Sequence, residues 1–196
     1  PQGTLYGRNT IGGAVKYVTR RLGPRTDVRL KGTLGNYQER DGVITASTPI
    51  NEQFRVGGTL ARFKHGGYGT NLFDGSPNYD KDIKAARLSA EWTPTPDLFV
   101  RLAGDITDDD SHPKNGHRLI VGRTSGAPIL SNVYDTNAEM LTALGHKQEV
   151  RQHGVAATVE WNVSPELTFK SITAQRQDKS WAPIDFDALP VVDMEV

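Results

Sequence analysis

The feature that most limits the fold is an alternation of apolar and polar side chains along segment after segment of the chain. No stretch of helical length keeps an apolar stripe at the spacing of a helix. Alternation with a period of two places apolar side chains on one face of a strand and polar ones on the other. The sequence therefore predicts an all-β, antiparallel chain. The expected strands are 27–36, 42–50, 53–64, 85–92, 98–107, 154–162 and 167 to about 175.

The connections between the expected strands alternate in length. Those near residues 50, 95 and 164 are short, whereas 65–84 and 108–152 are long and polar. Transmembrane barrels of the bacterial outer membrane have this asymmetry, with short periplasmic turns and longer extracellular loops. The mean hydropathy of −0.50 and the lack of an apolar run of about 18 residues exclude a membrane helix. Both are compatible with a membrane barrel, because its strands alternate lipid-facing with lumen-facing residues.

An internal repeat marks two of the expected hairpin ends. Residues 91–98, EWTPTPDL, and 160–167, EWNVSPEL, share the pattern E-W-x-x-x-P-[DE]-L. In each copy Trp92 or Trp161 closes one strand, a proline turn follows, and a leucine opens the next strand. Phe54 occupies a comparable place beside the turn at Pro49. We expect these aromatic side chains to form a girdle at a membrane interface.

The composition excludes several functional classes. Lys plus Arg and Asp plus Glu each number 23, so the net charge does not indicate nucleic acid as a partner. Cysteine is absent, which excludes disulfides and thiolate metal sites. Because G-x-S-x-G, H-E-x-x-H and phosphate-loop motifs are absent, no enzymatic activity or cofactor is predicted. The acids at 108–110 with His112 and His117 could ligate a metal, but such runs are usually solvated loop surfaces, and no metal site is predicted.

The first 22 residues are of a different kind, rich in glycine and with a short strand expected at 14–19. Their string PQGTLYGRNTIGGAV, followed by Val18-Thr19-Arg20, closely resembles the conserved end of the plug domain in TonB-dependent outer-membrane receptors. In that family an N-terminal plug fills a barrel of about 22 strands. The resemblance implies a plug end at 1–22, a linker at 23–26 and an incomplete N-terminal part of the transmembrane β-barrel at 27–196. Since residues 1–20 lack a secretory leader pattern, we expect an internal piece of a longer receptor.

The resemblance also implies a function and partners. The parent protein would lie in the bacterial outer membrane, surrounded by lipid, and would import a scarce nutrient, most commonly a ferric siderophore. The TonB–ExbB–ExbD complex would supply energy through a segment upstream of this chain. Two other hypotheses stay open: a secreted, soluble β-sandwich that binds a ligand, and a plain porin. A sandwich would bury the apolar faces in its core, and a porin would have no plug-like segment.

Two groups of residues are candidate sites. Loop side chains that combine aromatic and cationic character suit an anionic chelate, and the substrate-binding candidates are Tyr68, Tyr79 and Arg118, with Arg123 and Tyr134 of similar character. The polar faces of the strands would line the lumen and contact the plug. We expect Arg8 and Arg20 of the plug segment, together with Arg101, to hold the plug to the barrel wall, so that replacing Arg8 and Arg20 with Ala should raise passive leak. The other charged residues on this polar face are Arg29, Arg55, Arg87, Glu91, Asp105 and Glu160.

Overall fold

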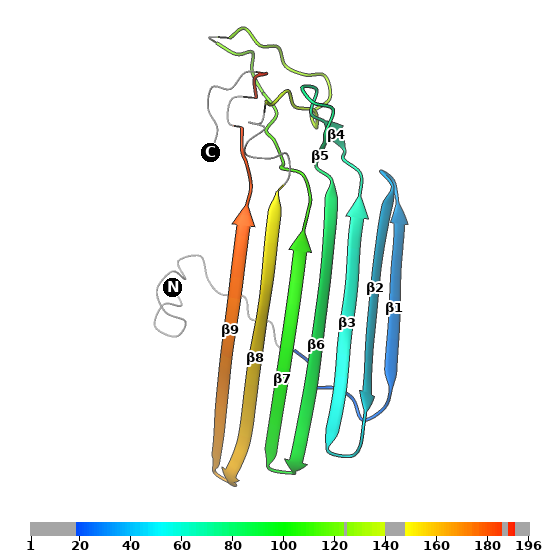
Figure 1. The fold of residues 1–196 in the computed structure, drawn as a ribbon, viewed down its shortest axis with the longest axis vertical. Helices are drawn as coiled ribbons and strands as arrows, with labels where there is room; N and C mark the ends of the chain where they lie inside the picture. The colour runs from blue at the N-terminus through cyan, green and yellow to red at the C-terminus, as the bar shows by residue number, and fades with distance from the viewer. Residues whose placement is uncertain (1–18, 124, 140–147, 186–187, 191–196) are drawn as a thin grey trace.

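The chain forms an open antiparallel sheet of seven strands in the order β1-β2-β3-β6-β7-β8-β9, with a separate two-stranded pair, β4-β5 (Figure 1). The structure is a computed structural model that describes residues 19–123, 125–139, 148–185 and 188–190. Each long strand pairs with the next long strand along the chain, so the sheet is a meander with β1 and β9 at its edges. In the described ranges, no helix is long and apolar enough to span a membrane.

All seven expected strands are present. The long strands are β1 (Asp27–Gly35), β2 (Glu39–Pro49), β3 (Phe54–His65), β6 (Lys81–Thr95), β7 (Leu98–Asp109), β8 (Glu149–Ser164) and β9 (Leu167–Trp181). The short strands β4 (Gly69–Thr70) and β5 (Pro77–Asn78) were not expected. The structure also starts β6 and β8 earlier than the sequence indicates and continues β9 further. These extensions consist mostly of polar residues, with Ile83, Val150 and Trp181 as isolated apolar ones, so alternation of hydropathy does not mark them.

The two ends of the sheet differ, as the connection lengths predict. At the turn end, residues 50–53, 96–97 and 165–166 join the strands, and at the loop end residues 66–80 and 110–148 form the long connections. The β1–β2 connection, also at the loop end, is a tight turn in which Glu39 N donates to Asn36 O at 3.2 Å. Tyr37 and Gln38 at its centre have φ of 57° and 61°, the left-handed values of a type I′ turn.

One face of the sheet is apolar and uncovered, and we call it the apolar face. Strand register aligns its side chains in rows, so that Leu60 of β3 lies opposite Ile44 of β2. Leu30 is 76% exposed and Leu88 is 70% exposed, and among the described residues the only buried apolar side chains are those of Phe99, Ala138, Pro113 and Pro183. A water-soluble sandwich would bury such side chains beneath a second sheet. In the described part of the chain no second sheet covers them.

The sequence repeat encodes the same hairpin end twice. The register shifts by one residue between Trp92 and Thr95 in the first copy and between Asn162 and Ser164 in the second copy. The side chains of these tryptophans are 47% and 48% exposed on the apolar face. Phe54 lies opposite Trp92, and Phe169 lies opposite Trp161. Aromatic side chains therefore gather at the turn end of the apolar face, in the arrangement that the repeat predicts.

Strand β9 departs from the apolar pattern of its neighbours. On the apolar face, Gln175 lies opposite Val155, and Thr173 lies opposite Ala157. The side of β9 that continues the apolar face is therefore polar along most of its length. Its pairing with β8 nevertheless runs without interruption from Glu149 to Asn162.

Candidate functional site

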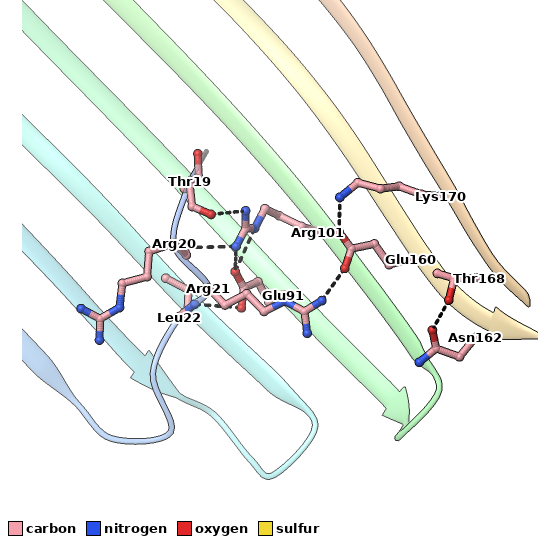
Figure 2. A network of polar contacts seen from close by, with 10 residues as sticks. All are labelled: Thr19, Arg20, Arg21, Leu22, Glu91, Arg101, Glu160, Asn162, Thr168 and Lys170. Carbon is pink, nitrogen blue, oxygen red and sulfur yellow. Dashed lines mark hydrogen bonds and ion pairs between the residues drawn. The ribbon is translucent and has the colours of Figure 1, made fainter. Parts of the chain in front are cut away.

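The face opposite the apolar face is polar, and the segment 19–22 crosses it near the turn end of the sheet (Figure 2). This segment belongs to the region that resembles a plug end. Between residues 19–27 and strands β1–β3 and β6 the polar face leaves a cavity of about 450 Å³. The contacts of the segment therefore decide how it is attached to the sheet.

Glu91 on β6 is the central side chain of this attachment. It is only 1% exposed, and strand pairing places it directly opposite Arg101 of β7. Its carboxylate accepts hydrogen bonds from Arg101 Nε at 2.8 Å, from Arg101 Nη2, and from the backbone N–H of Leu22 at 3.0 Å. A buried carboxylate requires such partners, because removing it from water is costly when it is unpaired. Glu91 thus joins a strand side chain to the backbone of the crossing segment.

Arg101 extends the attachment to Thr19 and Arg20. Its Nη1 donates to the carbonyl oxygen of Thr19 at 3.2 Å, and its Nη2 donates to that of Arg20 at 3.1 Å. Arg87 Nη2 donates to the hydroxyl of Thr19 at 3.3 Å. A planar guanidinium with five N–H donors suits this simultaneous contact with a carboxylate and two carbonyl groups.

The second copy of the repeat makes a related contact. Glu160 lies opposite Lys170, whose Nζ donates to Glu160 Oε1 at 2.5 Å, and the guanidinium of Arg21 pairs with the other carboxylate oxygen. The Arg21 guanidinium also lies 4.0 Å above the ring of Phe99, a side chain that is 6% exposed. We call the pairs Glu91–Arg101 and Glu160–Lys170 the twin clamp. Both pairs bind the segment 19–22 (Figure 2).

A third charged group lies further along the polar face. Arg176 donates to Asp105 through Nη1 at 3.1 Å and Nη2 at 2.7 Å, and Arg87 Nη1 lies 3.9 Å from the same carboxylate. Gly154 lies between Asp105 and Arg176 in the register. A Cβ at Gly154 would lie 3.0 Å from Arg176 Cγ, so the glycine leaves the space in which Arg176 reaches across β8.

At the loop end, aromatic rings form a cluster. Tyr68 contacts Tyr37 edge-on at 4.9 Å between ring centroids, stacks on His65 at 5.0 Å, and meets Tyr134 at 5.8 Å. Tyr79 meets Tyr134 edge-on at 5.9 Å. Tyr68 remains 40% exposed and Tyr134 45% exposed. The cluster therefore presents aromatic surface to the surroundings, which suits contact with a bound ligand.

Buried asparagines fasten the two long loops to each other. The side chain of Asn71, 1% exposed, donates to Ala138 O at 2.7 Å and accepts from Ala138 N at 3.0 Å. Asn78, equally buried, donates to Tyr134 O at 2.8 Å and accepts from Asn115 N at 3.1 Å. These bonds join residues that are far apart in the sequence, and they fix the backbone that carries the aromatic cluster.

Asp80 and His112 form a hydrogen-bonded pair at the base of the loops, with Nδ1 and Oδ2 3.0 Å apart. Burial of Asp80 opposes its ionisation. Hydrogen bonds from the side chain and backbone of His112 outweigh this effect and hold the pKa of the Asp80 carboxyl below its ordinary value of 3.8. Within the described residues, no group of three or more His, Asp or Glu side chains could hold a metal ion.

The candidate residues from the sequence analysis lie in different parts of the structure. Tyr68 and Tyr79 come together through Tyr134, whereas Arg118 donates to the carbonyl oxygen of Ala188 at 3.4 Å and lines a small cavity of about 60 Å³. Arg101 contacts the segment 19–22, as described above. Arg20 contributes its backbone carbonyl, and its side chain is exposed. Arg8 and the strand expected at 14–19 lie, apart from Thr19, outside the described residues.

Sequence reasoning missed Lys170, Arg21 and Phe99. One signal was present, since extending the repeat by three residues gives Arg101 in one copy and Lys170 in the other. No comparable signal exists for Arg21 and Phe99, because their contact joins residues on separate segments. A comparison of the chain with models of known protein families gave no match.

Proposed function

We propose that this chain is the plug end and the first seven barrel strands of a TonB-dependent outer-membrane receptor that imports a ferric siderophore or a similar scarce nutrient. The observation that carries the proposal is the arrangement of the two faces of the sheet. One face is apolar and uncovered, and the other binds the plug-like segment 19–22 through the twin clamp. A barrel with lipid outside and a plug inside requires both features.

The height of the apolar face supports contact with lipid. Along β6, the apolar face runs from the aromatic Trp92 to the first charged side chain, Lys84. About eight residues at about 3.3 Å each correspond to roughly 26 Å of strand, or about 20 Å of height after a tilt of about 40°. Outer-membrane barrels have an apolar band of about 25 Å flanked by aromatic girdles. At about 20 Å, the apolar face of β6 therefore comes within about 5 Å of the height of that band.

The structure of the loop end supports a ligand-binding function. Long loops face the outside in barrels of this class. Here the loops are cross-linked by buried asparagines and carry the cluster of Tyr37, Tyr68, Tyr79 and Tyr134. Aromatic rings of this kind could stack on an iron chelate. TonB–ExbB–ExbD would act through a plug segment upstream of this chain.

The alternatives explain less. A soluble sandwich needs a second sheet over the apolar face, and none covers it in the described ranges. A plain porin offers no reason for a buried Glu91 that bonds to the backbone of a crossing segment. The proposal accounts for both observations with one architecture.

The test is expression of the whole receptor gene in a bacterial outer membrane, followed by uptake of radiolabelled iron chelates. We expect uptake that requires TonB and that falls when Tyr68 and Tyr134 are both replaced with Ala. A double Ala variant of Ile120 and Val121, two exposed side chains of the second long connection outside the aromatic cluster, is the matched control and should transport normally. A protein that stays monomeric in water without detergent would contradict the proposal, and TonB-independent uptake would indicate a porin.

A further inference from the structure

On the apolar face, strand β9 presents polar side chains at the depth where its neighbour β8 presents apolar ones. Successive positions on this face of β9 carry hydroxyl or amide groups, and we call them the polar stripe: Ser171, Thr173, Gln175 and Gln177. Strand register places each of the first three opposite an apolar residue of β8. The stripe lies between Phe169 at the aromatic end and Lys179 at the charged end. In the proposed membrane it therefore lies within the hydrocarbon core.

The side chains of the polar stripe lack hydrogen-bond partners in the described part of the chain. Thr173, Gln175 and Gln177 are exposed, and within the described ranges no hydrogen bond joins a side chain of the stripe to another residue. Acyl chains offer neither donors nor acceptors, so an unpaired hydroxyl or amide group is costly in the hydrocarbon core. The stripe therefore requires a partner that brings polar groups to the same depth.

The apolar face is hollowed beside the polar stripe. A hollow of about 700 Å³ has Thr173 and Gln175 in its wall, and Gly104 and Ala157 are its smallest residues on this face. A Cβ at Gly104 would make only ordinary contacts, 3.7 Å from Gly154 O, so the packing of the strand does not itself require glycine there. Small residues let membrane-spanning segments approach one another closely. The hollow therefore gives a second protein surface access to the stripe.

We propose that the polar stripe and the hollow beside it form the interface between two copies of this receptor in the membrane. The inference rests on the proposed function, because only a lipid environment makes the stripe costly. Two copies inserted in the same direction form a closed pair about a twofold axis along the membrane normal, which brings residues to their own counterparts at the same depth. A hydroxyl or a primary amide both donates and accepts, so Thr173 and Gln175 can bond to their counterparts. This self-complementarity favours a second copy over a different protein.

The tilt of the strands keeps the charged ends of the two copies apart. Lys179 lies on the same face, and it would repel its counterpart if the two β9 strands ran side by side. Barrel strands are tilted by about 40° from the membrane normal, so the twofold axis makes the two β9 strands cross at about 80°. If they cross at Thr173, about six residues at about 3.3 Å each separate the two Lys179 residues by roughly 25 Å. The neutral part of β9 therefore forms the contact.

The first test is cysteine cross-linking of the whole receptor in outer membranes, with an added oxidant. The chain contains no cysteine, so a single introduced cysteine reports only on its own position within it. Thr173→Cys should give a disulfide-linked dimer, because the twofold axis brings the two copies of this residue together. The matched control is Leu30→Cys, on the same face but on the remote edge strand β1, and it should stay monomeric.

The second test is analytical ultracentrifugation of the receptor in a mild detergent. The wild type should be dimeric, and Thr173→Leu/Gln175→Leu should dimerise roughly 10-fold more weakly, the effect of two or three hydrogen bonds in a membrane. Leucine suits a lipid-facing position, so this variant should fold, and Leu30→Ala should dimerise like the wild type. A monomeric wild type, equal cross-linking of both cysteine variants, or a disulfide from Thr173→Cys to a different protein would overturn the inference. Failure of the proposed function gives a different result, a protein that needs no detergent.

Discussion

Replacement of Glu91 with Ala is the most direct perturbation of the twin clamp. The substitution removes the acceptor of the Leu22 N–H and the carboxylate that pairs with Arg101. The Arg101 side chain is 13% exposed and would remain as a largely buried cation without its acid. The matched control is Glu160→Ala, the equivalent position in the second copy of the repeat. Its carboxylate is more accessible, with 26% of its side chain exposed.

The two variants should differ because of burial. Loss of one partner from a buried ion pair costs about 3 to 5 kcal/mol, whereas an exposed pair contributes at most about 1 kcal/mol. The carbonyl groups of Thr19 and Arg20 also bond to Arg101 and offset part of the loss, so we expect about 3 kcal/mol for Glu91→Ala. A local loss of this size increases the opening of the segment roughly 150-fold.

Hydrogen exchange of the peptide that contains residues 19–26 measures this opening. In the wild type the Leu22 amide should be protected, because it donates to a buried carboxylate. Glu91→Ala should remove that protection, and Glu160→Ala should change exchange by no more than about fivefold. If Glu160→Ala accelerated exchange as much as Glu91→Ala, burial would not decide the strength of the clamp. Unchanged exchange in Glu91→Ala would refute the attachment itself.

Three further predictions concern the apolar face and the loop end. Leu88→Arg should cost about 2 to 4 kcal/mol in unfolding from bilayers, while a change within about 0.5 kcal/mol would place Leu88 in water. The lowered pKa of Asp80 gives the pair with His112 a stabilising effect above pH 3.8 that is lost as the pH falls through the folded value. An acid-active protease should therefore cut the 110–123 loop faster as the pH falls below the folded-state pKa of Asp80. The Asp80→Asn variant should show a weaker dependence of the cutting rate on pH. Asn71→Ala should cost about 2 to 3 kcal/mol and expose the loops to proteolysis, whereas the exposed Asn132 replaced with Ala should have little effect.

Much of the sheet could be predicted because alternation is a local property of the chain. Leu30, Leu88 and Val155 lie on the apolar face, where their spacing places them. The loop end escaped prediction, since the β4–β5 pair depends on contacts such as Asn71 with Ala138 that join distant segments. The Glu91–Arg101 pair of the twin clamp was predicted in part. Alternation placed Glu91 and Arg101 on one face, but only the register makes them opposite neighbours.

The sequence by itself determined the number of long strands, the apolar side of most of them and the duplicated hairpin end, because each follows from side chains within one or two strands. The tertiary structure decided which charges meet. It placed Glu91 between Arg101 and the Leu22 amide, and it brought Arg151 beside Lys179. These meetings depend on the register between strands, which a single bulge after each tryptophan shifts by one residue. Local hydropathy contains no information about such a shift.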